Sequence, residues 1–221
     1  FVSMTSHQFK TPLTTILSST ELMEMYFSQV PGEIKQKVEN HLGKISSEVI
    51  HMNNMINDFL ILEKFEIGKT PFNPSNFDIV TLSEDLIKTH FDLKKQQRKI
   101  NVHIHGQPYD YNGDSKLIRH VLMNLLSNAV KYSKGNPDLT ITFEEKKMTI
   151  SVLDDGVGIP EKDHESLFEP FYRAGNVQTK KGTGMGLAIA KKFVEQHSGN
   201  ISFKTETGKG TEFIVELPVE V

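Results

Sequence analysis

Three polar stretches in the second half of the chain have residue types and spacings that could do chemistry. The first reads DDGVGIP, from Asp154 to Pro160, and follows a strand-like run. A carboxylate at the end of a strand can accept a hydrogen bond from an exocyclic amine, and residues without side chains let a flat base approach closely. Adenine is such a base. An ordinary Asp-Gly turn would have the same sequence, so this stretch alone does not distinguish a turn from an adenine-binding site.

The second stretch reads KGTGMGL, from Lys181 to Leu187, and opens a helix-like segment. Glycine leaves backbone amides accessible, and at a helix N-terminus such amides form a site for phosphate. A single G-x-G-x-G pattern is a weak indication by itself. It gains weight from the other two stretches.

The third stretch reads NLLSNAVKY, from Asn124 to Tyr132. Asn124 and Asn128 are four residues apart and therefore share one helix face. Two neutral amide oxygens can hold a hard cation between phosphates without adding negative charge, and Lys131 lies within one turn of them. Two solvated asparagines would be the simpler interpretation of this stretch alone. The occurrence of all three stretches favours a site for a nucleotide and a cation.

His7 is a candidate nucleophile near the start of the chain. It lies one residue beyond an apolar seam position of a helix-like segment, so its imidazole should project beside the core. Pro12 lacks an amide hydrogen, so the carbonyl of Gln8 loses its helical partner, and we expect a bend there. An opened turn beside an exposed imidazole suits a nucleophile that meets a large phosphate donor; a packing kink is the alternative. The other histidines are interpreted as structural or solvated, although His120 lies four residues before Asn124.

The elements around His7 are predicted to be a helical hairpin over residues 1–65. Small or apolar residues recur at alternating steps of three and four at Val2, Ser6, Phe9, Leu13, Ile16, Thr20, Met23 and Phe27. After the helix-breaking Pro31-Gly32 pair the pattern resumes at Val38, Leu42, Ile45, Val49, Met52, Ile56 and Phe59. Such a heptad seam on two helices exposes too much apolar surface, so we expect a homodimer that closes a four-helix bundle.

The three polar stretches are predicted to lie in a second domain, residues 77–221, after a proline-containing linker over residues 66–76. The expected elements are helices over 79–95, 115–132 and 185–197, and strands over 100–105, 139–145, 147–155, 200–206 and 210–218. Helices mixed with an antiparallel-rich sheet indicate an α+β sandwich with helices on one face.

Composition narrows the function classes. The 221 residues carry 25 Lys+Arg and 28 Asp+Glu, a formal charge of -3, and contain no dense basic block, so neither nucleic acid nor a membrane surface is an expected partner. The chain contains no cysteine, which rules out disulfides and thiolate metal sites. No apolar run approaches the roughly 20 residues that cross a bilayer, and we expect a cytoplasmic segment of a longer protein that could itself be membrane-anchored.

These motifs resemble those of the sensor histidine kinases, whose catalytic domain is similar to the ATPase domains of type II topoisomerases and mismatch-repair proteins. Residues 124–132 resemble the N box of that family, 154–159 the first glycine box, 167–173 the F box and 182–186 the second glycine box. Residues 7–13, HQFKTPL, resemble its phosphoacceptor box. The resemblance implies a dimeric four-helix bundle followed by an α/β sandwich ATPase domain of the histidine kinase and topoisomerase type.

The resemblance also implies roles for individual residues. Asp154 would bind the adenine amino group, Asn128 and Asn124 would hold Mg²⁺, and Tyr132 would pack near the adenine. Lys131 and Arg173 would face phosphates, under a mobile lid over residues 161–183. The remaining nucleotide-binding residues would be Gly156, Gly158, Ile159, Phe168, Gly182, Thr183, Gly184, Met185, Gly186 and Leu187.

By the same resemblance, His7 would take a phosphoryl group from Mg-ATP and pass it to an aspartate on the receiver domain of a response regulator. Thr11 would position water for dephosphorylation. Gln8 stands where the family usually has a carboxylate, which leaves the general base open. Two alternatives remain: a degenerate kinase that acts as a nucleotide-responsive dimeric scaffold, which Gln8 favours, or a protein that is mainly a phosphatase of its regulator.

Overall fold

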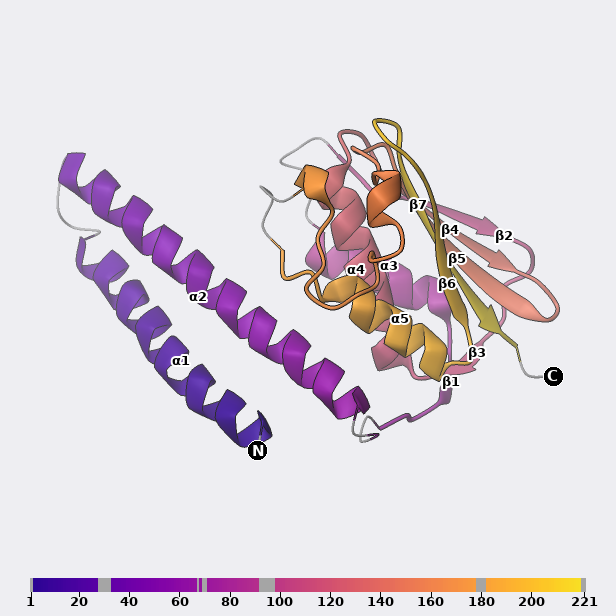
Figure 1. Cartoon of the computed structure of the whole chain (residues 1–221), viewed down its shortest axis with the longest axis horizontal. Coiled ribbons are helices and arrows are strands. Elements are labelled where there is room, and N and C mark those ends of the chain that lie inside the picture. The colour runs from indigo at the N-terminus through magenta and orange to yellow at the C-terminus, as the bar shows by residue number, and fades with distance from the viewer. Residues whose placement is uncertain are drawn as a thin grey trace. The chain divides into compact units, whose positions relative to one another are not determined.

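The computed structural model describes residues 2–27, 33–66, 68, 71–91, 98–177 and 182–219 (Figure 1). The side chains of residues 2–12, 33, 34 and 66 fall outside this description. The chain divides into two compact units, Phe1–Thr70 and Pro71–Val221, and the division falls inside the segment that we interpret as a linker.

The first unit is the predicted helical hairpin, formed by α1 (Val2–Phe27) and α2 (Glu33–Glu66). The α1 helix continues through Pro12 as one element. The heptad seam is divided between two faces. The positions buried between the helices are Leu13, Thr20, Leu42 and Val49, whereas Ile16, Met23, Ile45, Met52 and Phe59 are exposed. The Thr20 and Ser46 hydroxyls hydrogen-bond each other across the hairpin at 2.9 Å.

The second unit is the predicted α+β sandwich. Its five-stranded sheet has the order β2-β4-β5-β7-β6, in which only the β2–β4 pair is parallel. The strands are β2 (Asn101–His105), β4 (Asp138–Phe143), β5 (Lys147–Asp154), β6 (Asn200–Glu206) and β7 (Gly210–Pro218). Alternate residues of β4, β5 and β7 are buried, which places the core on one face of the sheet.

Three helices cover that face: α3 (Ile79–His90), α4 (Ser115–Tyr132) and α5 (Gly186–Gln196) (Figure 1). Asp78 and Asp114 are the N-caps of α3 and α4, where each carboxylate accepts two backbone N–H bonds. The first of these helices was predicted to reach Lys95, which is wrong, because α3 ends at His90 and Phe91 is its C-cap. Residues 92–97 lie outside the described part of the chain.

Two short strands were not predicted from the sequence. β1 (Ser75–Phe77) and β3 (Tyr111–Gly113) form an antiparallel pair, with Asn76 opposite Asn112. Strands of three residues are too short to show an alternating pattern, and Ser75 and Asn76 lie in the segment that we interpret as a linker.

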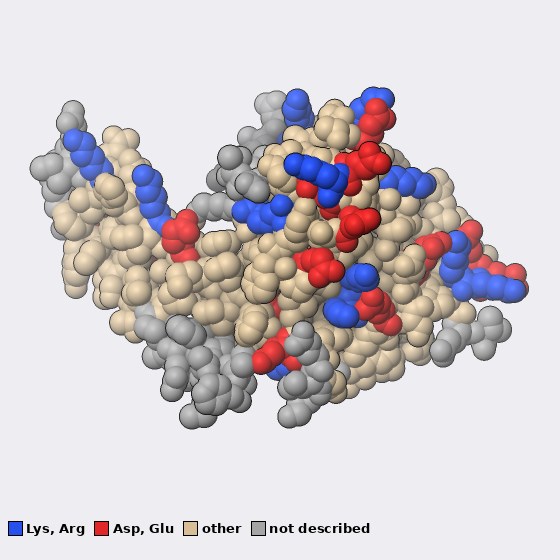
Figure 2. Space-filling view, viewed as in Figure 1, with Lys and Arg blue, Asp and Glu red and all other residues tan. Residues whose placement is uncertain are grey.

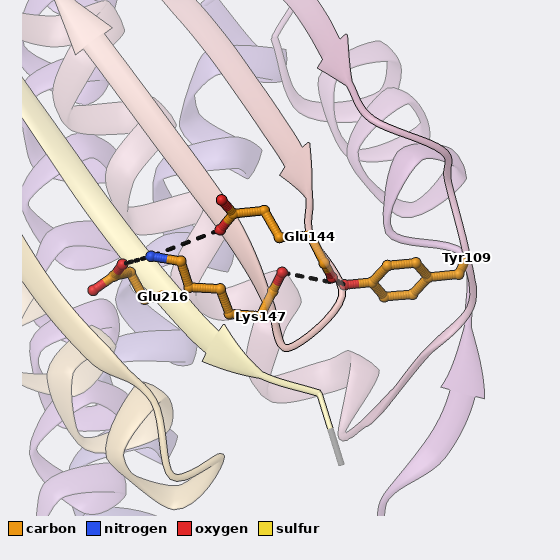
Figure 3. A network of polar contacts seen from close by, with 4 residues as sticks. All are labelled: Tyr109, Glu144, Lys147 and Glu216. Carbon is orange, nitrogen blue, oxygen red and sulfur yellow. Dashed lines mark hydrogen bonds and ion pairs between the residues drawn. The ribbon is translucent and has the colours of Figure 1, made fainter. Parts of the chain in front are cut away.

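The connection from β2 to β3 is held against the turn between β4 and β5 (Figure 3). The Tyr109 hydroxyl donates to the backbone carbonyls of Glu144 and Lys147, at 3.0 and 3.3 Å. Lys147 in turn pairs with the carboxylates of Glu144 and Glu216. Burial, followed by the charge of Glu144, raises the pKa of Tyr109. This network closes the end of β5 opposite to Asp154.

Charged side chains of both signs are interspersed on the face shown in Figure 2. Among the described helices, none is long and apolar enough to cross a membrane.

Candidate nucleotide-binding site

Asp154 is the most buried charged group among the candidate site residues. It ends β5, is 6% exposed, and accepts a hydrogen bond from the Gly156 amide at 2.8 Å. Burial raises the pKa of Asp154, and the backbone amides of Gly156 and Thr211 offset part of that rise. A carboxylate has about four lone-pair positions, so Asp154 has capacity to accept a further N–H from a ligand. Such a donor would compensate the cost of burying its charge.

Close backbone contacts explain the two glycines of the first glycine box. A Cβ at Gly156 would lie 2.5 Å from Oδ1 of Asp154 and 2.7 Å from the carbonyl oxygen of Tyr132. Gly158 has a φ of +64°, and a Cβ there would lie 2.1 Å from the carbonyl oxygen of Glu206. The neighbouring chain therefore fills the space beside both glycines. They shape the loop around Asp154, and Gly156 brings it against the end of α4.

The N box and the second glycine box meet at the start of α5. A Cβ at Gly186 would lie 2.7 Å from Oδ1 of Asn124, and a Cβ at Gly182 would lie 2.8 Å from Nζ of Lys131. Lys131 Nζ also lies 4.8 Å from the centre of the Tyr132 ring. The helix N-terminus, an amide oxygen and an ammonium group thus face one small region. Helix N-termini and lysine both attract phosphate.

Amide oxygens at this place fit a magnesium ion. Asn124 and Asn128 are one turn apart on α4 and are both partly exposed. Mg²⁺ takes oxygen ligands and is usually bound by a few protein groups together with substrate phosphates. The absence of a side chain at Gly186 lets the Asn124 amide pack against the start of α5, the helix N-terminus that could bind phosphate.

The F box packs against the second glycine box. Gly184 has a φ of +73°, and a Cβ there would lie 2.8 Å from both the carbonyl carbon of Phe171 and the carbonyl oxygen of Tyr172. The Thr183 hydroxyl accepts the Met185 amide at 3.2 Å. Met185 is fully buried, and Leu187 is half-buried at the first turn of α5.

Three further candidate residues contact neighbouring parts of the second unit. The Phe168 ring lies 6.0 Å from that of Phe203 and 5.6 Å from Nζ of Lys191, which places it in an aromatic cluster over the sheet. Arg173 donates from Nη2 to the Val177 carbonyl at 2.9 Å. The Ile159 amide donates to the Thr205 hydroxyl at 3.0 Å. His120, a weaker candidate, lies 5.7 Å from the ring of Phe193.

The phosphoacceptor candidates His7, Gln8 and Thr11 lie in α1, in the other unit. Thr11 follows His7 by four residues and therefore comes one helical turn later. Their side chains lie outside the described part of the structure.

Sequence reasoning missed several residues that support the site. The Thr205 and Thr211 hydroxyls contact each other at 2.9 Å beside Asp154, and Thr211 is opposite Asp154 in the β5–β7 pair. Both threonines lie in strands whose alternating pattern explains them without a site. The β6–β7 hairpin brings the two threonines together, and the pairing of β7 with the distant strand β5 brings Thr211 beside Asp154.

Arg98 and Asp155 fix the end of α4. Arg98 donates from Nε to the Gly135 carbonyl at 2.8 Å and from Nη1 to the Val130 carbonyl at 3.2 Å. Asp155 accepts the amides of Lys134 and Gly135, each at 3.0 Å. The Gly135 amide is the main cause of the lowered pKa of Asp155. Together they hold the helix that carries the N box against the loop that carries Asp154.

The chain thus combines a helical hairpin with a sandwich that carries a polar site between α4, α5 and β5, which is the two-domain architecture expected from the sequence motifs. Residues 1–68 match the family model of the His Kinase A (phospho-acceptor) domain. Residues 113–221 match that of the histidine kinase-, DNA gyrase B- and HSP90-like ATPases. The chain belongs to the sensor histidine kinase family.

Curated relatives match over nearly the whole chain. Sensor histidine kinase WalK of Bacillus subtilis is 36% identical over 225 residues, which cover 99% of this chain and 36% of WalK. Sensor histidine kinase YkoH of the same organism is 33% identical over 219 residues, 98% of this chain and 47% of YkoH. The chain therefore spans less than half the length of either relative.

Solved structures show the same fold. Full-length ShkA in complex with AMPPNP superposes with a TM-score of 0.81 at 23% identity, covering 100% of this chain and 46% of ShkA. The Acinetobacter baumannii histidine kinase AdeS gives a TM-score of 0.62 at 22% identity, covering 95% of this chain and 96% of AdeS.

Proposed function

We propose that this chain is a histidine kinase core that autophosphorylates His7 with Mg-ATP. The phosphoryl group then passes to an aspartate on the receiver domain of a response regulator. The observation that carries the proposal is that three groups lie along α4 and the loops packed against it: the buried Asp154 carboxylate beside the end of the helix, the Asn124 amide oxygen at Gly186, and the Lys131 ammonium at Gly182. Their donors and acceptors complement an adenine, a metal ion and a phosphate chain.

In this proposal Asp154 accepts a hydrogen bond from the adenine amino group, and the Tyr132 ring lies beside the base. Asn124 and Asn128 hold the magnesium ion, which when bound neutralises phosphate charge and orients the transferred group. Lys131 and Arg173 bind phosphate oxygens, and the N-terminus of α5 contributes backbone amides. Phosphoryl transfer requires mainly positioning and charge neutralisation, which is what these groups provide.

His7 supplies the nucleophilic nitrogen. An imidazole with an ordinary pKa near 6.5 is mostly neutral at pH 7, so one ring nitrogen has a free lone pair and the other carries a proton. As a phosphorus–nitrogen bond forms, the bond from phosphorus to the departing oxygen of the donor breaks, and the ring proton leaves. Gln8 can accept a hydrogen bond from the ring N–H but cannot take the proton.

ShkA, whose fold this chain shares, was solved in complex with AMPPNP, an analogue of ATP, and this supports a nucleotide ligand here. The divided seam of the hairpin supports the homodimer. Ile16, Met23 and Ile45 follow Leu13, Thr20 and Leu42 by three residues each, and the later set is exposed while the earlier set is buried. A second hairpin placed on the exposed set would complete a four-helix bundle.

Dephosphorylation of the regulator is a second candidate activity, favoured by the position of Thr11 one turn after His7 on α1. A hydroxyl there can hold a water molecule against a phosphorylated partner. A scaffold without kinase activity is favoured only by Gln8, and the assembled polar site in the second unit argues against it.

Incubation with radiolabelled Mg-ATP tests the proposal. We expect label that is stable to base and labile to acid, as a phosphoramidate should be. His7→Ala should abolish the label while leaving the affinity for ATP unchanged, because the acceptor and the nucleotide site belong to separate units. Label of the same amount on the His7→Ala protein would overturn the assignment of the acceptor.

A further inference from the structure

Asp163 is a buried carboxylate whose two oxygens bind two separate points of the chain. It ends the short 3-10 helix η2 (Glu161–Asp163) and is 4% exposed. Oδ1 accepts the Tyr172 hydroxyl at 2.7 Å, and Oδ2 accepts the Gly175 amide at 3.1 Å. The hydrogen bond from Tyr172 is the main cause that lowers the pKa of Asp163, so the group is ionised at pH 7. Burying a charge is costly unless it is well bonded, as this one is.

Arg173 and Ala174 lie between these two points. Ala174 is 5% exposed, and the Arg173 guanidinium donates to the Val177 carbonyl at 2.9 Å. Residues 171–177 are called the F-box turn below. Because Asp163 binds the residue before Arg173 and the second residue after it, one carboxylate fixes the backbone on both sides of that arginine.

The F-box turn also carries backbone strain. Phe171 has a φ of +66°, and its side chain is 60% exposed. Left-handed backbone is unfavourable for a bulky residue and persists only where surrounding contacts hold it. The Tyr172–Asp163 bond holds the residue that follows Phe171. Gly184 contacts the same backbone from the other side, where a Cβ would lie 2.8 Å from the carbonyl carbon of Phe171.

A second tie joins the F-box turn to the first glycine box. η3 (Gly175–Val177) begins at the glycine bound by Asp163, and Asn176 donates from Nδ2 to the Gly158 carbonyl at 2.9 Å. The turn is thus attached to the loop that follows Asp154. Its orientation is set relative to the adenine side of the candidate site.

We propose that Asp163 is a positioning residue, which clamps the F-box turn through Tyr172 and Gly175 so that Arg173 can bind the nucleotide phosphates. The inference rests on the proposed function and adds a residue that acts through Arg173. It predicts a defect that depends on the phosphates of the ligand. A residue needed only for the fold would affect every ligand of the site alike.

Tyr172→Phe is the mildest test, because it removes one hydroxyl and keeps the ring. By titration calorimetry with Mg²⁺ present, we expect ATP affinity to fall about tenfold, the scale of a charge-assisted arginine–phosphate contact. Adenosine affinity should change by less than about twofold, because the lost hydrogen bond is to Asp163, and the bond from Asn176 to the Gly158 carbonyl remains. The split between ATP and adenosine is the signature of positioning.

Asp163→Ala and Asp163→Asn test the carboxylate itself. Asp163→Ala removes both hydrogen bonds and should weaken ATP binding at least as much as Tyr172→Phe. In Asp163→Asn the amide oxygen can accept the Gly175 amide, and the amide NH₂ can donate to the Tyr172 hydroxyl. We therefore expect Asp163→Asn to retain most of the ATP affinity. If Asp163→Ala does not fold, the Tyr172→Phe and Asp163→Asn proteins still test whether Asp163 positions the F-box turn.

Tyr109→Phe is the matched control, since it also deletes the hydrogen bonds of a tyrosine hydroxyl and keeps the ring, at the far end of β5 (Figure 3). It should leave both affinities unchanged. If the wild-type protein binds ATP but Tyr172→Phe weakens ATP and adenosine equally, or weakens neither, the clamp is wrong and the proposed function stands. A wild-type protein that binds neither ligand overturns the proposed function and the clamp together.

Discussion

The two units of the chain bury their apolar residues in opposite ways. In the second unit the large side chains on one face of α4 and of the sheet are inside, and Leu125, Leu139 and Ile141 are fully buried. Among the described seam residues of the hairpin, those buried are spaced seven residues apart, at Leu13 and Thr20 and again at Leu42 and Val49, while the residues three positions later are exposed. The second unit therefore buries its apolar face within itself, whereas the hairpin buries one apolar stripe and leaves a second stripe exposed.

This difference indicates how each unit is stabilised. A sheet covered by three helices buries its apolar face within one chain. Two helices of a hairpin can bury only one apolar stripe between them. The heptad seam of this hairpin has a second apolar stripe, as in a four-helix bundle, and in a single chain that stripe is exposed to water. We infer that the nucleotide site forms within one chain, whereas the hairpin needs a second copy. The following substitutions test that separation, beginning with the largest expected effect.

Asp154→Asn should weaken ATP binding between about tenfold and 10²-fold, because a hydrogen bond to a buried charged acceptor is lost. The same change should stabilise the second unit at pH 7. The pKa of Asp154 is raised, so the folded protein prefers the neutral form, which asparagine resembles. The gain should shrink as pH falls through the raised pKa. A gain of about 1 kcal/mol corresponds to a rise in Tm of about 2–4 °C.

Asp138→Asn provides a control of opposite sign. Burial raises the pKa of Asp138, but hydrogen bonds from Asn101 and His103 outweigh it and the net pKa is lowered. The ionised form therefore stabilises the fold at neutral pH, and this contribution is lost as pH falls through the lowered pKa. Asp138→Asn should lower Tm at pH 7 and leave ATP affinity unchanged. A lower Tm for Asp154→Asn would contradict the burial argument.

Much of the fold could be predicted because its patterns are long. The heptads around Leu13 and Leu42 predicted the hairpin, and the alternation in residues 139–143 and 148–152 predicted central strands that the structure confirms. The end of α3 at His90 was not predictable, because the helix-forming residues beyond it continue without a stop signal. The strand pair β1–β3 depends on pairing between segments about 36 residues apart.

The candidate site divides in the same way. Residue type and spacing alone identify Asp154, Asn124 and the glycines of residues 182–186 as candidate site residues. The sequence does not single out Asp163 and Thr211, because their roles depend on contacts formed by the fold, with the Tyr172 hydroxyl and with strand β5 at Asp154. The sequence also could not show that backbone of Glu206 fills the space beside Gly158.

Ile16→Glu tests the uncovered face of the hairpin. Ile16 is 44% exposed in the single chain, and burying such a side chain in a dimer contributes about 1.5–3 kcal/mol. Because a dimer contains the substitution twice, we expect its dissociation constant to rise at least about tenfold in analytical ultracentrifugation. ATP affinity should not change.

Ile104→Glu is the control for surface charge alone, since Ile104 is 36% exposed on β2 of the second unit. It should leave the dissociation constant of the dimer unchanged. Equal association of the wild-type and Ile16→Glu proteins would mean that the uncovered stripe is not the dimer interface, and the contrast between the two units would lose its explanation.

Gln8→Glu should have the smallest effect and the opposite direction, an increase in the rate of autophosphorylation. A carboxylate beside His7 could accept the ring proton and hold the reactive tautomer, whereas glutamine can only accept a hydrogen bond. The increase should stay below the roughly 10²-fold of a full general base, because the phosphorus–nitrogen bond can form before the proton is lost. Affinity for ATP should be unchanged, since the substitution lies in the hairpin.

Single-turnover labelling at saturating Mg-ATP, from pH 6 to 9, separates these contributions. An ordinary imidazole has a pKa near 6.5, so we expect the wild-type rate to rise over the lower part of this pH range and then level off. If proton removal limits the reaction, Gln8→Glu should raise the plateau itself. A plateau of equal height in both proteins, with equal ATP affinity, would show that the missing carboxylate does not limit the reaction.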